Sequence, residues 1–141
     1  IDGEPTMKAL TLALAALALT AGSAAAETVT ITLTGVEARP GRILASLNTR
    51  DQFLRAAPAY EAVAQPVAGG VTLTFENVAP GDYALMVMHD LNANGQFDFG
   101  TDGWAFSNSA RPMTGPPAFD DHRFSVANAP VTLTETLRYG F

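Results

Sequence analysis

The sequence predicts an all-β fold, a single-domain antiparallel β-sandwich of about seven strands. Short runs such as Thr28-Val-Thr-Ile-Thr-Leu-Thr34 alternate polar and apolar residues, which is the period of a strand with one buried face. Turn-forming residues separate these runs, and helical patterns are nearly absent. The run Tyr83–Met88 is almost wholly apolar, which is typical of a central strand covered on both faces.

The expected strands, in chain order, are Thr28–Thr34, Gly41–Leu47, Gly70–Glu76, Tyr83–Met88, His122–Val126 and Val131–Tyr139. A Pro-Gly turn at Ala79–Asp82 leads into the central strand. Only Asp51–Tyr60 has the pattern of a helical turn, and Pro58 limits its length. Two connections are long, over residues 49–69 and 90–121, and long connections in compact domains are usually functional.

The first residues predict export. Lys8, a short alanine-rich apolar run and Ala24-Ala25-Ala26 indicate a secretory signal peptide over residues 7–26, cleaved before Glu27. The alternative is a retained transmembrane anchor, which needs roughly 20 strongly apolar residues and is disfavoured by this shorter run. Residues 1–6 precede the expected start methionine and are set aside as a cloning scar or upstream residues. We expect a periplasmic or secreted β-sandwich over residues 27–141, with no transmembrane span in the mature chain.

Composition narrows the classes of function. The chain has no cysteine, so an exported domain of this sequence must be stabilised by packing alone or by packing and a metal. It carries 14 acidic residues against 8 lysines and arginines, a net charge of −6. This charge disfavours nucleic-acid binding, which requires basic patches to neutralise phosphates.

The segment Asp90-Leu-Asn-Ala-Asn-Gly-Gln-Phe-Asp98 predicts a calcium-binding loop. It places oxygen-bearing side chains at loop positions 1, 3, 5 and 9 and glycine at position 6, where calcium loops turn sharply. The expected ligands are Asp90, Asn92, Asn94, the backbone carbonyl of Gln96, Asp98 and Asp102. Position 12 is Thr101 where such loops have a bidentate glutamate, so we expect weak binding, with a dissociation constant of about 10⁻⁴–10⁻³ M. A metal-free turn, signalled by Asn94-Gly95, and a different hard cation are the alternatives.

The histidines and aromatic residues allow other hypotheses. His89 and Asp90 are adjacent, as in some hydrolase sites, but the additional histidines of a metal site are missing, and His89 is more simply a hydrogen-bonded structural residue. His122 begins a strand in a charged stretch and is expected to be solvated. Trp104, Phe106 and Phe119 lie in the long connection, where they form either an exposed partner-binding surface or a second, buried core.

Three motifs together resemble a bacterial secreted family known as domain of unknown function 2141. They are Val78–Asp98, Gly103-Trp-Ala-Phe-Ser-Asn-Ser109 and Gly115-Pro-Pro-Ala-Phe-Asp120. The resemblance covers Glu27–Phe141 and implies a secreted β-sandwich of the prealbumin-like or Ig-like kind, with no assigned activity. Members usually carry a longer insert between Asp98 and Gly103, so a ligand that the insert supplies can be missing here.

These observations favour an exported, non-catalytic module that binds a partner, an envelope protein, through a calcium-organised Asp90–Asp102 loop. A carrier that holds a small apolar ligand between the sheets is the second hypothesis, and Met86 and Met88 would line its cavity. The third is a hydrolase using His89 and Asp90, which requires both side chains to face one water-accessible pocket.

Overall fold

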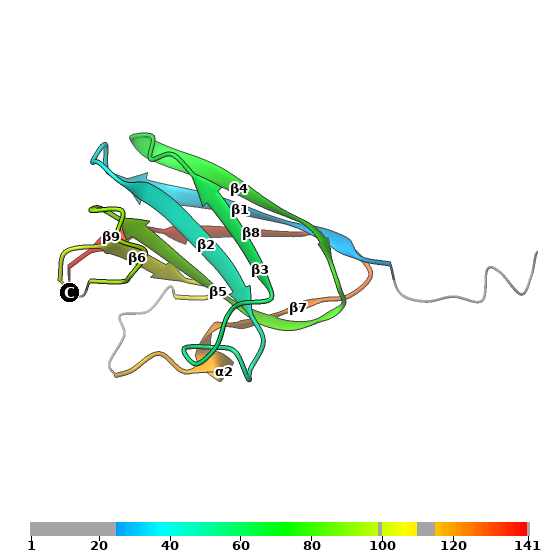
Figure 1. Cartoon of the computed structure of the whole chain (residues 1–141). Helices are drawn as coiled ribbons and strands as arrows, with labels where there is room; N and C mark the ends of the chain where they lie inside the picture. Colours follow the sequence, from blue (N-terminus) through cyan, green and yellow to red (C-terminus); the bar gives the residue numbers. More distant parts are fainter. Residues whose placement is uncertain (1–24, 99, 110–114, 141) are drawn as a thin grey trace, which may run out of the picture.

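A computed structural model describes residues 25–98, 100–109 and 115–140 of the chain. Two β-sheets pack face to face (Figure 1). The expected signal peptide falls mainly on residues outside this described part. The elements are β1 (Glu27–Val36), β2 (Arg42–Asn48), β3 (Tyr60–Ala64), β4 (Gly69–Val78), β5 (Gly81–Asp90), β6 (Gly103–Phe106), α2 (Phe119–His122), β7 (Arg123–Val126), β8 (Val131–Thr136) and β9 (Arg138–Tyr139). The described part contains no helix long and apolar enough to span a bilayer.

The smaller sheet has three strands in the order β4-β1-β8. β1 and β4 are antiparallel, but β1 and β8 run parallel in unbroken register from Val29 opposite Val131 to Thr34 opposite Thr136. The prediction of an antiparallel β-sandwich is therefore confirmed, and the parallel pairing of β1 with β8 is a departure from it. A parallel pair is possible here because nearly the whole domain lies between β1 and β8 in the chain, whereas strands joined by a hairpin must be antiparallel.

The larger sheet has the path β3-β2-β5-β6-β9, with β7 also pairing with β5. The two long connections are interrupted by strands, β3 in the first and β6 in the second, so the structure has more strands than the sequence predicted. β3 and β6 have four or five residues each, and every residue of β6 is buried, so neither strand produces a clear polar–apolar alternation. The expected helical turn after β2 is a series of turns, with Gln52 and Phe53 donating to the Thr49 carbonyl.

The core between the sheets comes from the inward-facing residues of each strand. Val29, Ile31 and Leu33 of β1 and Leu85 of β5 are fully buried there. Fully burying such a side chain contributes about 1.5–3 kcal/mol, so the alternating pattern of β1 is itself a large part of the stability of the smaller sheet. Side chains from both layers fill this space, which is where the carrier hypothesis would place a ligand.

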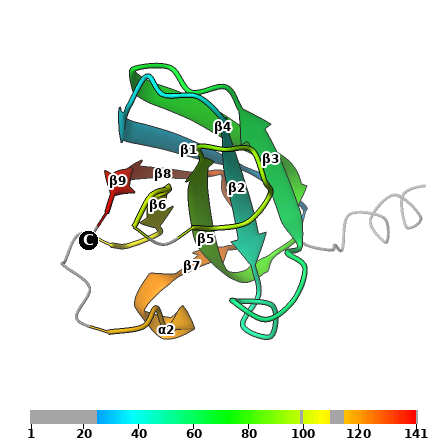
Figure 2. The ribbon, with the colours of Figure 1, turned by 60° about the vertical axis from the view of Figure 1, so that its left-hand side comes forward.

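A second cluster covers the outer face of the larger sheet. We call it the aromatic cluster, and it consists of Phe53, Ala84, Trp104, Phe106 and Phe119, with Met86 and Phe97 packed against it. Phe53 comes from the turn after β2 and Phe119 from α2, and both ribbon views place these two segments together below β5 (Figures 1 and 2). Their rings meet edge to face, with centroids 6.0 Å apart. β5 is therefore covered on both faces, as its apolar sequence predicts.

Gly41 allows the chain to enter β2 close to the end of β5. Its φ is +97°, and an added Cβ would lie 1.9 Å from the carbonyl oxygen of Asp90. A side chain at this position would meet backbone atoms, which cannot move as a side chain can. The positive φ adds a separate conformational cost for any other residue.

We therefore expect Gly41→Ala to lower the free energy of unfolding by about 3 kcal/mol or more, from backbone overlap and strain combined. Urea unfolding of the two proteins measures it. Gly69→Ala is the matched control, because Gly69 has a φ of +92° but open space around it. Equal losses for the two variants would show that the approach of Gly41 to Asp90 is not tight.

Two tyrosines hold the turn between β4 and β5. The Tyr83 hydroxyl donates to the Ala79 carbonyl at 2.7 Å, and the Ala79 N–H donates to the Tyr60 hydroxyl at 3.0 Å. Burial, together with the neighbouring Tyr60, raises the pKa of Tyr83 to about 12, from an ordinary value of 10.0. The folded state thus holds this phenol in its neutral form.

The sign of this pKa shift predicts alkaline destabilisation. The neutral Tyr83 contributes its full stabilisation below pH 10, and this contribution is lost as the pH rises from 10 toward about 12, because only the unfolded chain ionises readily in that window. Chemical unfolding at a series of pH values should show this decline, and Tyr83→Phe should flatten it. An unchanged slope in the variant would assign the decline to other groups.

Candidate functional site

The predicted calcium loop joins two neighbouring strands of the larger sheet. Asp90 is the last residue of β5, and Asp102 immediately precedes β6, which pairs with β5. The two aspartates are 0% and 1% exposed, although loop residues between them are largely at the surface. The sheet thus brings together the first and last of the predicted ligand residues.

Both buried carboxylates are bound by the backbone of the loop itself. The Asp90 oxygens accept N–H groups of Asn94 at 3.3 Å and Gly95 at 2.8 Å. The Asp102 oxygens accept N–H groups of Leu91 at 3.1 Å and Asp98 at 2.9 Å. Each of these four oxygens therefore has one donor, and a carboxylate has room for about four in total.

The other predicted ligands lie nearer the surface. The side-chain amides of Asn92 and Asn94 donate to the same Asp98 oxygen at 3.2 and 3.1 Å. Gln96 is exposed, and its N–H donates to the side-chain oxygen of Asn94 at 2.9 Å. Gly95 has a φ of +78°, which confirms the sharp turn expected at the sixth loop position.

The same loop lacks a ready-made carboxylate cluster. Among the described residues, no three histidine, aspartate or glutamate side chains converge closely enough to hold a metal ion. A cation in this loop would consequently need amide and backbone oxygens in addition to the carboxylates. All these donors are hard oxygens, which suit calcium and magnesium and disfavour copper and zinc.

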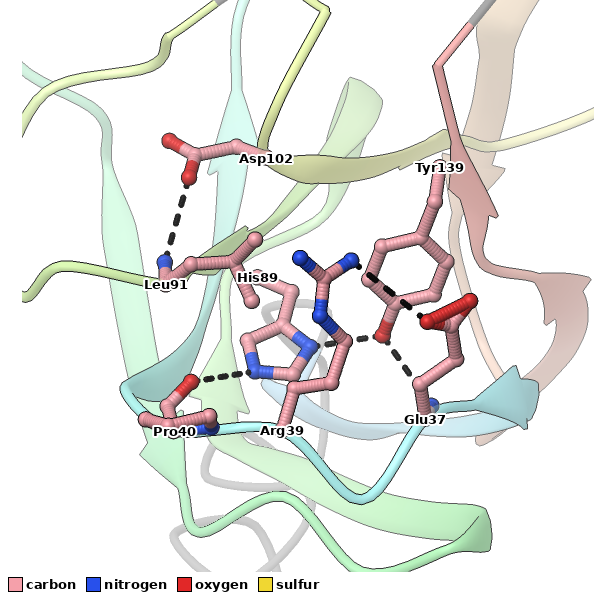
Figure 3. A network of polar contacts seen from close by, with 7 residues as sticks. All are labelled: Glu37, Arg39, Pro40, His89, Leu91, Asp102 and Tyr139. Atoms are coloured by element: carbon pink, nitrogen blue, oxygen red, sulfur yellow. Dashed lines mark hydrogen bonds and ion pairs between the residues drawn. The ribbon is translucent and has the colours of Figure 1, made fainter.

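His89 is a fully buried structural residue at the end of the core (Figure 3). Its Nε2–H donates to the Pro40 carbonyl at 3.0 Å, because a carbonyl can only accept, and Nδ1 then accepts the Tyr139 hydroxyl at 2.6 Å. The same hydroxyl accepts the Glu37 N–H at 3.1 Å. Burial raises the pKa of the Tyr139 hydroxyl, which keeps it protonated as the donor to His89.

This placement removes the support for the hydrolase hypothesis. Both ring nitrogens of His89 are used, and the ring faces the core, whereas the side chain of Asp90 lies on the opposite face of β5. The two residues therefore do not share a water-accessible pocket.

The expectation that His122 is solvated is wrong. His122 is 4% exposed, it stacks on Phe106 with ring centroids 4.9 Å apart, and its Nδ1–H donates to the Ser107 carbonyl at 2.8 Å. The Ser107 hydroxyl in turn donates to the His122 carbonyl and accepts the Leu85 N–H. These bonds fasten the segment after β6 to β5, a structural role that a charged-looking sequence does not reveal.

Trp104, Phe106 and Phe119 are buried, at 8%, 9% and 8% exposure, within the aromatic cluster. The Trp104 indole N–H donates to the Gly140 carbonyl at 3.0 Å. Of the two expectations for these residues, the buried second core is confirmed, and the exposed partner-binding surface is wrong. They can support a binding surface from beneath, but they do not form it.

Comparison with known proteins identifies the family. The sequence profile of a bacterial family described as "Uncharacterized protein conserved in bacteria (DUF2141)" matches residues 31–134. The chain belongs to the DUF2141 family. No curated protein and no solved structure matches it. Residues 31–134 of this DUF2141 chain include the Asp90–Asp102 loop, β6 and most of both sheets.

Tyr139 is the residue of this DUF2141 site region that sequence reasoning missed. The sequence predicts that it lies in a strand, and nothing in its spacing relates it to His89, which lies 50 residues earlier. The relation arises from β6, which places β9 one strand away from β5. Gly103 makes the contact possible, since a Cβ there would lie 2.7 Å from the Tyr139 ring.

Removing only the Tyr139 hydroxyl tests the hydrogen bonds that join Tyr139 to His89 and Glu37. We expect Tyr139→Phe to lower the free energy of unfolding by about 1–3 kcal/mol, because a buried His89 nitrogen loses its donor and the Glu37 N–H loses its acceptor. Urea unfolding measures the loss, and Tyr60→Phe, which removes the hydroxyl that accepts the Ala79 N–H at the edge of the sandwich, serves as the comparison. A loss no greater than that of the control would contradict the proposed role of Tyr139.

Proposed function

We propose that this DUF2141 protein is an exported, non-catalytic binding module whose Asp90–Asp102 loop is organised by calcium. The observation that carries the proposal is the burial of two carboxylates, Asp90 and Asp102, at the two ends of one loop. Its natural partner is another envelope protein, which would contact the surface of the residues 90–121 connection. A strongly acidic chain is unsuited to nucleic acid.

Burying a carboxylate is costly unless a cation compensates for it. Within the described residues, neither Asp90 nor Asp102 forms an ion pair, and the ion pairs that do form lie on the surface, between Arg39 and Glu37, Arg50 and Asp120, and Arg123 and Asp82. Backbone N–H groups recover part of the lost hydration, at about 1.5–3 kcal/mol for a bond to a charged group. A divalent cation near both carboxylates would offset much of the remainder.

The donor set fits a hard cation. Asp90 and Asp102 keep acceptor capacity beyond their backbone bonds, and Asp98 lies between the amides of Asn92 and Asn94. Rotating either amide by a half-turn exchanges its nitrogen for its oxygen. Rotating both amides would replace the two N–H donors that face Asp98 with two oxygens. It would also break the hydrogen bonds that the Asn92 and Asn94 side-chain oxygens accept from backbone N–H groups. Bound calcium would supply the charge that holds these oxygens together.

Loop order is linked to the second core. Phe97 packs against the aromatic cluster, and the backbone N–H of its neighbour Asp98 donates to the Asp102 carboxylate. A cation held by the loop would therefore fix Phe97 over the outer face of the larger sheet. This would give the exposed part of the connection one defined shape, which is what recognition of a partner requires.

Calcium should raise the stability of the protein by mass action. With a dissociation constant of about 10⁻⁴–10⁻³ M, 10 mM calcium would stabilise the native state by about 1.4–2.7 kcal/mol. Thermal melting of the full chain with calcium and with a chelator measures this, and isothermal titration gives the affinity directly.

Asp98→Asn should abolish the effect of calcium while leaving the fold, because Asp98 is only partly buried. Asp90→Ala would remove a loop ligand and two backbone bonds together. Asp121→Asn is the matched control, an exposed carboxylate outside the loop, and should keep the full calcium response. Equal melting temperatures with calcium and chelator in the unaltered protein would refute the metal and leave a metal-free turn.

Export rests on the predicted signal peptide, and it is tested separately. Expression of the whole sequence in a bacterium, followed by fractionation and mass spectrometry, should give a periplasmic or secreted product beginning at Glu27. A cytoplasmic product that retains Lys8 would contradict it.

A further inference from the structure

The Asn94-Gly95 pair lies at the exposed tip of the Asp90–Asp102 loop. A Cβ built on Gly95 would meet no heavy atom of the described residues within 4 Å, and glycine itself has no side chain to shield its backbone nitrogen. An asparagine followed by glycine is therefore open to one reaction, in which the glycine nitrogen attacks the side-chain carbonyl carbon of the asparagine. The hydrogen bonds around the pair determine whether the folded loop favours this reaction or opposes it.

The attacking atom is the Gly95 nitrogen, which must lose its proton as the new bond forms. Its N–H donates to Oδ2 of Asp90 at 2.8 Å, within the range of about 2.6–3.2 Å that a general base requires. Asp90 is 0% exposed, so bulk water does not compete for this oxygen. The Asp90 carboxylate is thus positioned to accept the proton.

The reacting amide of Asn94 is held at both of its polar atoms. Attack develops negative charge on Oδ1, and this oxygen accepts the Gln96 N–H at 2.9 Å, a distance at which such a donor stabilises an oxyanion. The departing nitrogen, Nδ2, donates to Oδ2 of Asp98 at 3.1 Å. Each atom whose charge or bonding changes in the reaction therefore has a suitable partner in the loop.

Asn92, two residues earlier, lacks this arrangement. The residue after it is Ala93, whose Cβ shields the backbone nitrogen. The Ala93 N–H donates to the backbone carbonyl of Asp90 at 3.3 Å, a neutral acceptor and not a base. The comparison singles out Asn94 within the loop.

We propose that Asn94 deamidates itself in the folded protein, with Asp90 as the base. The Gly95 nitrogen bonds to Cγ of Asn94, the Cγ–Nδ2 bond breaks, and the proton taken by Asp90 passes to Nδ2, which leaves as ammonia. The product is a five-membered cyclic imide. Water then opens the imide, giving aspartate if it adds at Cγ and isoaspartate if it adds at the backbone carbonyl carbon of Asn94. Water is the only co-reactant.

The conversion changes the charge of the loop. It replaces a neutral amide with a carboxylate in a segment that already contains Asp90, Asp98 and Asp102. The affinity of calcium loops depends on the number of charged ligands, so the aspartate form should bind calcium several-fold more tightly. This consequence rests on the proposed calcium function, whereas the deamidation itself needs no metal.

The test is incubation of the full protein at neutral pH with a chelator, followed by peptide mapping with mass spectrometry. Asn94 should gain the mass that exchange of an amide NH₂ for a hydroxyl adds, with release of ammonia, while Asn92 stays unchanged as the internal control. Asp90→Asn should slow the conversion by about tenfold or more, because a general base contributes at least that. Gly95→Ala leaves Asp90 in place and should also slow it.

The same proteins in urea separate the effect of the fold from that of the Asn-Gly pair. The unaltered protein should convert faster folded than unfolded, and Asp90→Asn should have no effect on the unfolded chain. Circular dichroism establishes which variants fold. Slower conversion in the folded state would overturn the proposal, and so would equal folded-state rates for the unaltered protein and Asp90→Asn.

Calcium titration of Asn94→Asp beside the unaltered protein tests the consequence separately. Several-fold tighter binding by the variant is expected. Failure of both proteins to bind calcium would refute the proposed function, and the mass measurement would still decide whether Asn94 deamidates.

Discussion

The structure depends on strand β5 being covered on both faces. Its inward residues, including Leu85 and Val87, complete the core between the sheets, and its outward residues Ala84 and Met86 lie beneath the aromatic cluster. A three-stranded sheet can cover only one side of a larger sheet, so the second cover must come from connections. The turn after β2, the Asp90–Asp102 loop and α2 each contribute an aromatic ring to it. These long connections thus cover the outer face of the larger sheet, as a third layer would.

Polar residues in these connections hold the covering segments in place. Ser107 and His122 fasten one segment to β5 through hydrogen bonds that are out of contact with water. His89 joins the β1–β2 turn to the C-terminal strand at the opposite end of the sandwich. Buried hydrogen bonds of this kind contribute little net free energy, but an unmade one is costly, so they select one arrangement of the connections over others.

The sequence predicted the parts of this fold that alternate or are uniformly apolar. β1, β4 and β5 were located within a few residues, because burial on one face or on two leaves a direct trace in the order of residues. β3 and β6 were missed, since short strands that are poor in alternation have no such trace. The parallel pairing of β1 with β8 could not be read at all, because it depends on where the whole chain returns in space.

The candidate site shows the same division. Spacing alone placed Asp90, Gly95 and Asp102 in one loop, and the structure brings the two aspartates to its buried ends. Burial of Trp104 and His122 could not be settled from composition, because charged neighbours and a loop position both suggest exposure. The role of Tyr139 could not be predicted, because its contact with His89, 50 residues earlier, depends on β6, a strand that the sequence did not reveal.

The pairing of β1 with β8 also has a kinetic consequence. Thr34 and Thr136 meet across 102 residues, so the smaller sheet cannot be completed until nearly all of the chain is present. Contacts of such high sequence separation slow folding, because loop-closure entropy is lost before they form. Until β8 arrives, β1 has an open edge that can pair with another chain. A nascent chain of this protein therefore cannot complete its fold until its last long strand has been synthesised.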